Sequence, residues 1–241
     1  MSKMPQLIHW ILAALAASTL RALNAFPSAP ILQINETSAT AATGPSIANF
    51  VSTQFNLDGP QVSPITNSSW DWWYFDVLSE DLKTSLVIVF YAALPSAFPF
   101  LLNPTNVTTV GVYATFADGT IFATYLDVDE AVVVTAGDGS SGVYDGQAAW
   151  LGAPDMSSYQ IIIDSPKNGV VGTFNLFSVA PAHYPCGPAG PGVNMQSGPR
   201  IGWSNAVPDA IGEVDMQING TSMAFTGIAY HDKVSYLFSI R

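Results

Sequence analysis

Charged residues are scarce in this chain of 241 residues, and basic ones are the scarcest. Only 10% of the residues are Asp, Glu, Lys or Arg, and 7 basic side chains against 18 acidic ones give a formal net charge of −11. Nucleic-acid binding depends on clusters of Lys and Arg that neutralise phosphates, and this sequence contains no such cluster. The composition therefore excludes a nucleic-acid partner.

Cysteine and the common catalytic motifs are almost absent as well. Cys186 is the only cysteine, so no intrachain disulfide can form and the fold must rely on its apolar core. No HExxH, CxxC, P-loop or G-x-S-x-G pattern occurs, and the histidines are few and far apart, so we expect no metal site. A literal G-x-G-x-x-G pattern at residues 137–142 lacks a helical stretch after it, and we interpret it as a hairpin loop.

The rest of the composition favours strands and turns over helices. Hydrophobic residues make up 49% of the chain, and Gly (19) and Pro (17) recur between short apolar runs. These runs lie at residues 70–77, 85–92, 109–116, 120–127, 131–135, 158–163, 172–179, 214–218 and 222–229. Their spacing predicts an antiparallel β-sandwich or barrel. A Pro/Gly-rich segment at 180–213 interrupts the series and is typical of a functional loop.

The start of the chain is typical of a secretory signal peptide. Lys3 precedes an apolar stretch at 10–20, and Ala25 is a suitable cleavage position, so we expect residues 1–25 to be removed and the protein to be secreted. The stretch is too short for a stable membrane span, although an uncleaved N-terminal anchor is the alternative. Four sequons support the secretory interpretation, with glycosylation expected at Asn35, Asn67, Asn106 and Asn219. Residues 26–69 are predicted to form an extended lead-in that adds an edge strand.

The sequence SWDWWYFD at residues 69–76 carries aromatic side chains on both faces of the predicted strand. Because side chains alternate along a strand, Trp70, Trp72 and Tyr74 share one face, and Asp71, Trp73 and Phe75 share the other. We interpret the Trp70 face as core. A carboxylate on an apolar face is costly unless it is paired, so we expect Asp71 to face a ligand pocket that Trp73 and Phe75 line.

Four motifs in order resemble the carotenoid 1,2-hydratase (hydroxyneurosporene synthase)-like superfamily and, within it, the fungal Diels–Alderase family. They are residues 69–76, 183–187 (HYPCG), 202–210 (GWSNAVPDA) and 227–233 (GIAYHDK). The resemblance implies two β domains, a sandwich-like first half and a lipocalin-like second half, with the substrate pocket between them. We expect residues 70–233 to be the N-terminal domain and 234–241 a divergent tail. The second domain is then missing from this chain, which puts its activity in doubt.

The resemblance also implies a function. It predicts a cofactor-independent pericyclase that catalyses an intramolecular Diels–Alder type (4+2) cyclisation of a polyene in polyketide or polyketide–amino acid biosynthesis. Such a reaction needs no nucleophile, metal or redox cofactor. The catalyst holds an apolar substrate in one folded conformation and donates a hydrogen bond to its carbonyl group.

Candidate site residues follow from this hypothesis. Asp71 is the predicted hydrogen-bonding group, and His231 and Asp232 are predicted to act as an acid–base pair, to contact the substrate, or to brace the domain junction. Tyr184 and Trp203 are predicted to border the mouth of the pocket. Three alternatives stay open: a hydratase or dehydratase of a terpenoid or polyene, a non-catalytic lipocalin-like carrier, and an inactive fragment.

Overall fold

The computed structural model describes residues 32–53, 56–102 and 104–238 as an antiparallel, all-β fold. This architecture confirms the fold class expected from the sequence. The predicted signal peptide at residues 1–25 lies outside the described residues. Within the described ranges the one helical element is η1 (Pro166–Asn168), a single 3-10 turn, and no helix there has the length and apolar character needed to cross a membrane.

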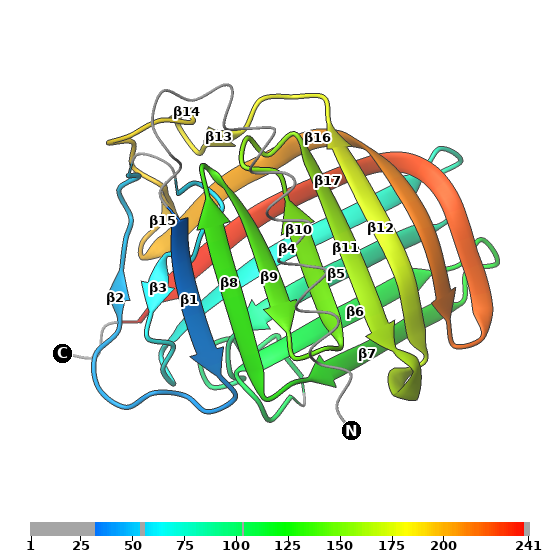
Figure 1. The fold of residues 1–241 in the computed structure, drawn as a ribbon, viewed down its shortest axis with the longest axis horizontal. Coiled ribbons are helices and arrows are strands. Elements are labelled where there is room, and N and C mark those ends of the chain that lie inside the picture. Colours follow the sequence, from blue (N-terminus) through cyan, green and yellow to red (C-terminus); the bar gives the residue numbers. More distant parts are fainter. Residues whose placement is uncertain (1–31, 54–55, 103, 239–241) are drawn as a thin grey trace.

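A single sheet of 15 strands bends into two layers that cross each other at a steep angle (Figure 1). A separate small sheet pairs β2 (Ile47–Ala48) with β3 (Val62–Ser63). The layer nearer the viewer in Figure 1 contains, in order, β1 (Leu32–Ser38), β8 (Glu130–Ala136), β9 (Gly139–Tyr144), β10 (Ala148–Gly152), β11 (Ser158–Ser165) and β12 (Val170–Ser178). The farther layer contains β4 (Ser69–Ser79), β5 (Ser85–Ala92), β6 (Thr108–Thr115) and β7 (Ile121–Asp127).

Two long strands join the layers, β16 (Ile201–Ile218) and β17 (Thr221–Leu237). One half of β16 pairs with β12 in the near layer, and the last part of β17 pairs with β4 in the far layer. The pairing of β16 with β17 shifts register twice between Asn205 and Ala210, around Pro208, which has no N–H to donate. These irregularities allow the two strands to curve from one layer into the other.

The strand β16 corrects part of the sequence analysis. Residues 201–213 were expected to belong to the irregular Pro/Gly segment, but they lie in β16, and only residues 180–200 are irregular apart from β13 (His183–Tyr184), β14 (Gly187–Pro188) and β15 (Gln196–Gly198). Residues 234–237 of the expected tail continue β17. The edge strand expected in the lead-in is present as β1, which pairs with β8. The 137–142 segment is a hairpin, whose glycines at 139 and 142 lie in β9.

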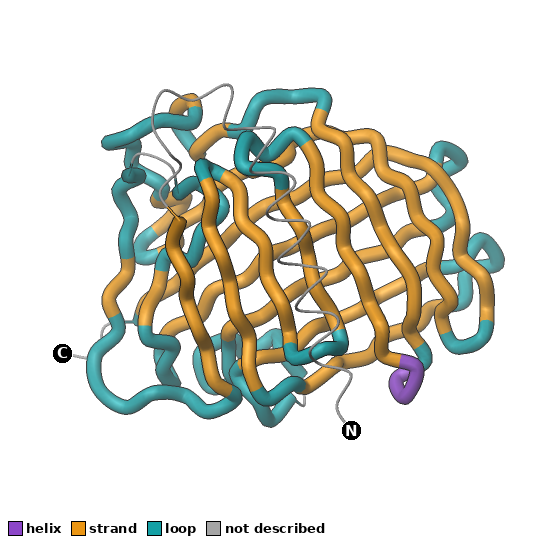
Figure 2. Tube along the Cα trace, viewed as in Figure 1, coloured by secondary structure: helices purple, strands orange, loops and turns teal. Residues whose placement is uncertain are grey.

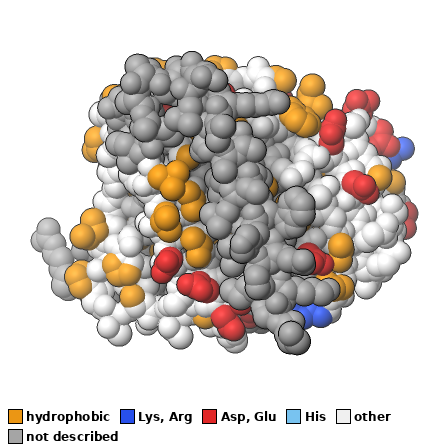
Figure 3. All heavy atoms as spheres, viewed as in Figure 1, with side chains coloured by type: hydrophobic (Ala, Val, Ile, Leu, Met, Phe, Trp, Pro, Cys, Tyr) orange, Lys and Arg blue, Asp and Glu red, His pale blue; other side chains and the backbone are white. Residues whose placement is uncertain are grey.

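The main core lies between the two layers, whereas the loops gather at their rims (Figure 2). Phe75, Phe90, Trp150 and Phe174 are among its fully buried side chains. The solvent-facing side seen in Figure 3 carries scattered acidic side chains along its right and lower edges and few basic ones, as the net charge of −11 requires.

Gly227 permits the close pairing of β17 with β4, and this generates a prediction. A Cβ atom at this position would lie 2.0 Å from the carbonyl oxygen of Leu78. Gly227→Ala should therefore destabilise the fold by about 1–3 kcal/mol, because the backbone of β4 must move. Urea unfolding measures the change. Gly190→Ala is the control, since a Cβ there meets nothing within 4 Å, and equal stability of the two variants would contradict the proposed constraint.

Candidate functional site

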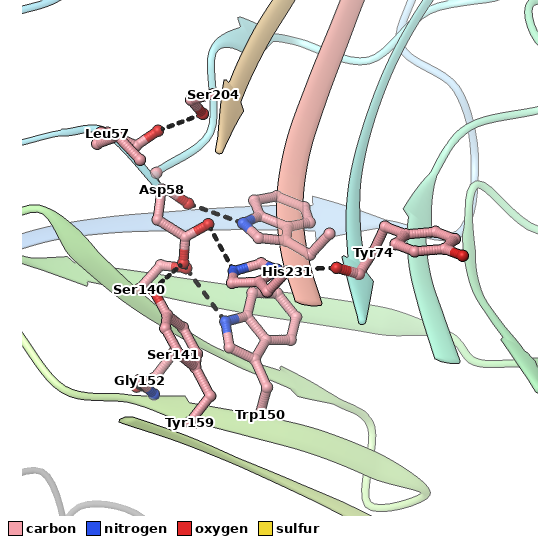
Figure 4. Close-up of polar contacts among 12 residues, drawn as sticks. Leu57, Asp58, Tyr74, Ser140, Ser141, Trp150, Gly152, Tyr159, Ser204 and His231 are labelled. Atoms are coloured by element: carbon pink, nitrogen blue, oxygen red, sulfur yellow. Dashed lines mark hydrogen bonds and ion pairs between the residues drawn. The ribbon is translucent and has the colours of Figure 1, made fainter. Parts of the chain in front are cut away.

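A buried carboxylate, Asp58, is the centre of the polar network between the layers (Figure 4). Its Oδ1 lies 3.0 Å from His231 Nε2, and its Oδ2 accepts hydrogen bonds from Ser140 Oγ at 2.6 Å and Tyr159 OH at 2.9 Å. His231 Nδ1 lies 2.9 Å from the carbonyl oxygen of Tyr74, which can only accept a hydrogen bond. Both ring nitrogens therefore contact oxygen atoms, and His231 and Asp58 form a buried pair that shares a hydrogen bond.

The backbone around Asp58 is fastened to both layers. The carbonyl oxygen of Asp58 accepts a hydrogen bond from Trp73 Nε1 at 2.8 Å, and that of Leu57 accepts one from Ser204 Oγ at 2.9 Å. The His231 ring stacks on Phe75 at 3.9 Å between centroids. Asp58 and His231 are both 0% exposed. A network this closed to solvent has no access for a substrate, so we assign it a structural role.

Asp71, the residue singled out from the sequence, forms a second buried ion pair. Its Oδ1 lies 2.5 Å from Lys233 Nζ, and its Oδ2 accepts hydrogen bonds from the backbone N–H groups of Gln61 and Val62. Burial raises the pKa of Asp71, against the lowering effect of Lys233 and the two N–H donors. Burial also lowers the pKa of Lys233, against the charge of Asp71. The cost of placing this carboxylate on an apolar face is therefore offset by a lysine of the same chain, and no ligand is needed to pair it.

The space beside Asp71 is small. A cavity of about 120 Å³ is lined by Asp71, Trp73 and Tyr144 together with parts of β1 and β3, whereas pockets for drug-sized ligands are typically about 300–1,000 Å³. Phe75 does not line this cavity and is packed among Phe90, Trp150 and His231. The inward face of β4 is therefore core, with room for a small polar molecule at most.

The opposite face of β4, interpreted from the sequence as core, is core at Trp70, which is buried in a second hydrophobic cluster, and is incompletely covered from Trp72 to Asp76. Its side chains join those of β16 and β17 in what we call the outer aromatic face. This face consists of Trp72, Tyr74, Asp76, Trp203, Tyr230 and Asp232, all of them half-buried. In the register of β4 with β17, Tyr74 lies opposite Asp232 and Asp76 lies opposite Tyr230. Phenols and carboxyl groups thus alternate across the two strands.

Asp232 is held by its aromatic neighbours. Its Oδ2 accepts hydrogen bonds from Trp203 Nε1 and Tyr230 OH, both at 2.9 Å. Burial raises the pKa of Asp232, and the hydrogen bonds from Trp203 and Tyr230 oppose this rise. Burial also raises the pKa of Asp76, with Tyr74 lowering it and Asp232 raising it further. Burial, followed by the nearby carboxyl groups, raises the pKa of both Tyr74 and Tyr230, so both phenols stay protonated.

The structure separates several residues that the sequence analysis had grouped. His231 and Asp232 point to opposite faces of β17, so they do not form the acid–base pair considered from the sequence, and His231 pairs with Asp58 instead. Tyr184 is buried in the main core, where burial raises its pKa to about 12. Trp203 lies on the outer aromatic face. Tyr184 and Trp203 therefore do not border one common opening.

Sequence reasoning missed Asp58 and the role of Lys233. Asp58 lies in the expected lead-in and pairs with a residue 173 positions away, a separation that no local pattern reveals. Lys233 closes the 227–233 motif, and its inward position follows from the strand alternation that also places His231 inside. The alternation of side chains along residues 227–233 could therefore have predicted that Lys233 points inward, where it meets Asp71.

The geometry describes an all-β protein with a packed interior and an aromatic, carboxyl-bearing outer face. A family model described as Diels-Alderase-like matches residues 29–240. The chain therefore belongs to the Diels-Alderase-like family. Within the ranges that the structure describes, no group of three or more His, Cys, Asp and Glu side chains is arranged to hold a metal ion.

The curated relatives are named either for quinolone epoxide rearrangement or as Diels-Alderases. The chain is 33% identical over 194 residues to the quinolone epoxide rearrangement protein asqO of Emericella nidulans, an alignment that covers 78% of this chain and 52% of that protein. It is 35% identical over 197 residues to the quinolone epoxide rearrangement protein penF of Penicillium thymicola, covering 78% and 54%. Its identity to the Diels-Alderase ucsH of an Acremonium species is 27% over 186 residues, covering 71% and 44%. The chain thus spans about half the length of these relatives.

Among solved structures, the crystal structure of CghA has the same fold. The TM-score is 0.65 at 19% sequence identity, and the match covers 86% of this chain and 56% of CghA. This likeness supports the architecture alone.

Breaking the Asp58–His231 pair tests its structural role. Asp58→Asn breaks this buried pair by removing one of its two partners, so it should lower the free energy of unfolding by about 3–5 kcal/mol. Chemical denaturation measures this loss. Asp209→Asn makes the same change at an exposed position and should alter stability by less than about 0.5 kcal/mol. A similar, small effect of both variants would contradict the role assigned to Asp58.

The raised pKa of Asp232 predicts a pH dependence. Because this carboxyl group holds its proton more tightly in the folded chain than in the unfolded one, its contribution to stability is greatest below the ordinary value of 3.8 and is lost as the pH rises through the raised pKa. Thermal unfolding of the wild type and of Asp232→Asn from pH 3 to pH 8 checks this. The melting temperature of the wild type should fall relative to that of the variant as the pH increases. A constant difference would refute the assignment.

Proposed function

We propose that this chain forms part of a cofactor-independent cyclase of secondary metabolism, which folds an apolar, conjugated substrate against the outer aromatic face and promotes an intramolecular Diels–Alder type (4+2) cyclisation. The observation that carries the proposal is this face itself, where half-buried rings surround hydrogen-bonding groups on a continuous sheet. The proposed site moves from the Asp71 face of β4 to the opposite face, because the Asp71 side chain is held in an ion pair.

The rings and phenols supply what such a reaction requires. Flat side chains such as Trp72 and Trp203 can stack on a polyene and hold it in one reactive conformation, which removes conformational entropy before the reaction. The phenols of Tyr74 and Tyr230 stay protonated. The single O–H of Tyr230 is donated to Asp232 in the free protein, so in this proposal it turns from that carboxyl group to the substrate carbonyl as charge develops on its oxygen, and Tyr74 turns from Asp76 in the same way. Their carboxyl neighbours Asp76 and Asp232 orient them.

A second candidate function is the rearrangement of an epoxide. The higher identities, 33% and 35%, are to proteins named for quinolone epoxide rearrangement, whereas the Diels-Alderase ucsH is 27% identical. A rearrangement would use the same aromatic surface, with a phenol or carboxyl proton donated to the epoxide oxygen. Both candidates conserve mass, whereas a hydratase or dehydratase changes the mass by one water.

Deletion of the gene in its source organism tests the proposal. The deleted strain should accumulate a precursor with the same mass as the product that disappears, because a cyclisation or rearrangement only redistributes bonds. Mass spectrometry detects the pair, and ultraviolet absorbance and NMR distinguish the loss of conjugated double bonds in a (4+2) cyclisation from the loss of an epoxide. A mass difference of one water would instead establish the hydratase class, and an unchanged metabolite profile would refute an enzymatic role.

Restoring the gene with substitutions locates the site. Trp72→Ala should reduce product formation by at least about tenfold, because one stacking surface of the proposed site is lost. The control Trp150→Phe changes a buried indole between the layers. It should lower the stability of the protein but leave product formation by the folded protein largely unchanged. Full product formation by folded Trp72→Ala protein would remove the outer aromatic face from the mechanism.

We also propose that the chain enters the secretory pathway and carries glycans at two of its four sequons. Asn67 and Asn219 are exposed, the latter in the turn between β16 and β17. Asn106 is half-buried and donates a hydrogen bond from Nδ2 to the carbonyl oxygen of Val128 at 2.9 Å, and Asn35 lies half-buried within β1. Both are poor places for a bulky glycan.

Expression in a fungal secretory host checks this proposal. Digestion with a peptide-N-glycosidase should lower the mass of the secreted protein, and Asn67→Gln and Asn219→Gln should each remove one glycan, whereas Asn106→Gln should remove none. Retention of an unglycosylated protein inside the cell, or a glycan at Asn106, would refute it.

A further inference from the structure

We propose that the outer aromatic face binds a positively charged nitrogen, so that the molecule it recognises carries a protonated amine beside its apolar part. This inference rests on the proposed function in one respect, namely that this face is the substrate site, and it specifies the class of substrate. It follows from the unpaired carboxyl groups, the rings around them and the unsatisfied acceptor atoms beneath them.

The two carboxyl groups of the face have no cationic partner in the described part of the chain. The three ion pairs found there are Lys83–Asp81, His231–Asp58 and Lys233–Asp71. Lys233 follows Asp232 in the sequence, but its side chain points into the core and is bound to Asp71. Asp76 and Asp232 therefore form no ion pair, and the nearby Asp232 contributes to the raised pKa of Asp76.

Aromatic rings lie beside these carboxyl groups, and aromatic π-faces attract cations. Trp72, Tyr74, Trp203 and Tyr230 are half-buried, and the Tyr74 and Tyr230 rings meet edge to face at 6.3 Å between centroids. A ring that presents its π-face to an ammonium group stabilises it, and the effect grows when the site is partly desolvated. A neutral apolar ligand would gain from the rings but not from the two carboxyl groups.

An unsatisfied amide gives independent support. Asn205 is 5% exposed and lies directly opposite Asp232 in the pairing of β16 with β17. Its Nδ2 lies 3.3 Å from His183 Nε2, while its Oδ1 has no hydrogen-bond partner. Asp232 Oδ1 also lacks a partner, and the unpartnered donor nearby, Trp72 Nε1, lies close enough to lower the pKa of Asp232.

A comparison of hydrogen-bond acceptors with donors on this face indicates the chemistry of the ligand. Each carboxylate can accept about four hydrogen bonds and the amide oxygen two, more than the single donors of Trp72, Tyr74, Trp203 and Tyr230 around them can fill. A further hydrogen-bond donor would therefore find acceptor sites here, and a charged donor gains most in a partly buried site. An ammonium group supplies several N–H donors and a positive charge at once. A carboxylate or phosphate would meet only repulsion here.

Binding of two probes of similar size tests the inference on the 241-residue chain. Benzylammonium should bind roughly tenfold more tightly than benzyl alcohol at neutral pH, because only the ammonium interacts with the carboxyl groups and the rings together. Tryptophan fluorescence and the NMR shifts of the Trp72 and Trp203 indole N–H groups report the binding and its location. Equal affinities for the two probes would overturn the inference.

Three variants separate a local site from general attraction by the negative chain. Asp76→Asn and Asp232→Asn should each reduce the preference for benzylammonium to less than about threefold, whereas Asp129→Asn, which removes the same charge from an exposed position, should leave it unchanged. Circular dichroism checks that each variant is folded, and Asp76→Asn decides the matter should Asp232→Asn unfold. A preference that survives both substitutions would overturn the inference.

The outcome is independent of the metabolite test. Isomer formation that depends on Trp72, combined with equal binding of the two probes, would refute the ammonium site and leave the proposed function intact. Preferential binding of benzylammonium without any isomer in the deleted strain would refute the enzyme and retain the ligand site.

Discussion

Two buried ion pairs, each with one partner on β17, join this strand to the rest of the interior. His231 and Lys233 point inward from β17 and neutralise Asp58 and Asp71, which are 0% and 1% exposed. Each unpaired charge would cost several kcal/mol in such an environment, so each pair has to be complete, with its remaining lone pairs satisfied by N–H or O–H donors. The residues Leu57 and Asp58 are therefore held by hydrogen bonds from several strands, although they lie outside any strand.

The same strand sets the geometry of the opposite surface. Because side chains alternate, a residue pattern that sends His231 and Lys233 inward sends Tyr230 and Asp232 outward. The inward contacts fix the position of the backbone, so the outward phenol and carboxyl group occupy fixed positions opposite Asp76 and Tyr74. A site built on such a strand is more precisely arranged than one built on a loop. The packed interior and the incompletely covered outer aromatic face both follow from the register of β17 with β4.

Much of the fold was predictable because it depends on local patterns. The alternation in residues 70–77 and the turn after Ala117 are period-two and turn signals that act over a few residues. The strand at 201–213 escaped prediction because Pro208 and two glycines are read as strand breakers, whereas here irregular pairing with β17 accommodates them. The site was harder. Which face of β4 is open depends on the other layer, whose Trp150 packs against Trp73 on the inward face of β4, and Asp58 meets His231 only in the three-dimensional fold.

The carboxyl groups with a structural role differ from those of the proposed site in their partners more than in their burial. Asp58 and Asp71 meet cations of the same chain, so their charges are already compensated and a ligand has nothing to add. Asp76 and Asp232 are only partly buried, yet burial raises the pKa of both, because they meet rings and hydroxyl groups rather than a cation. Such a carboxyl group can gain stabilisation from a molecule that brings the missing charge or proton. This contrast is the physical reason for proposing the ligand site on the outer aromatic face rather than in the interior.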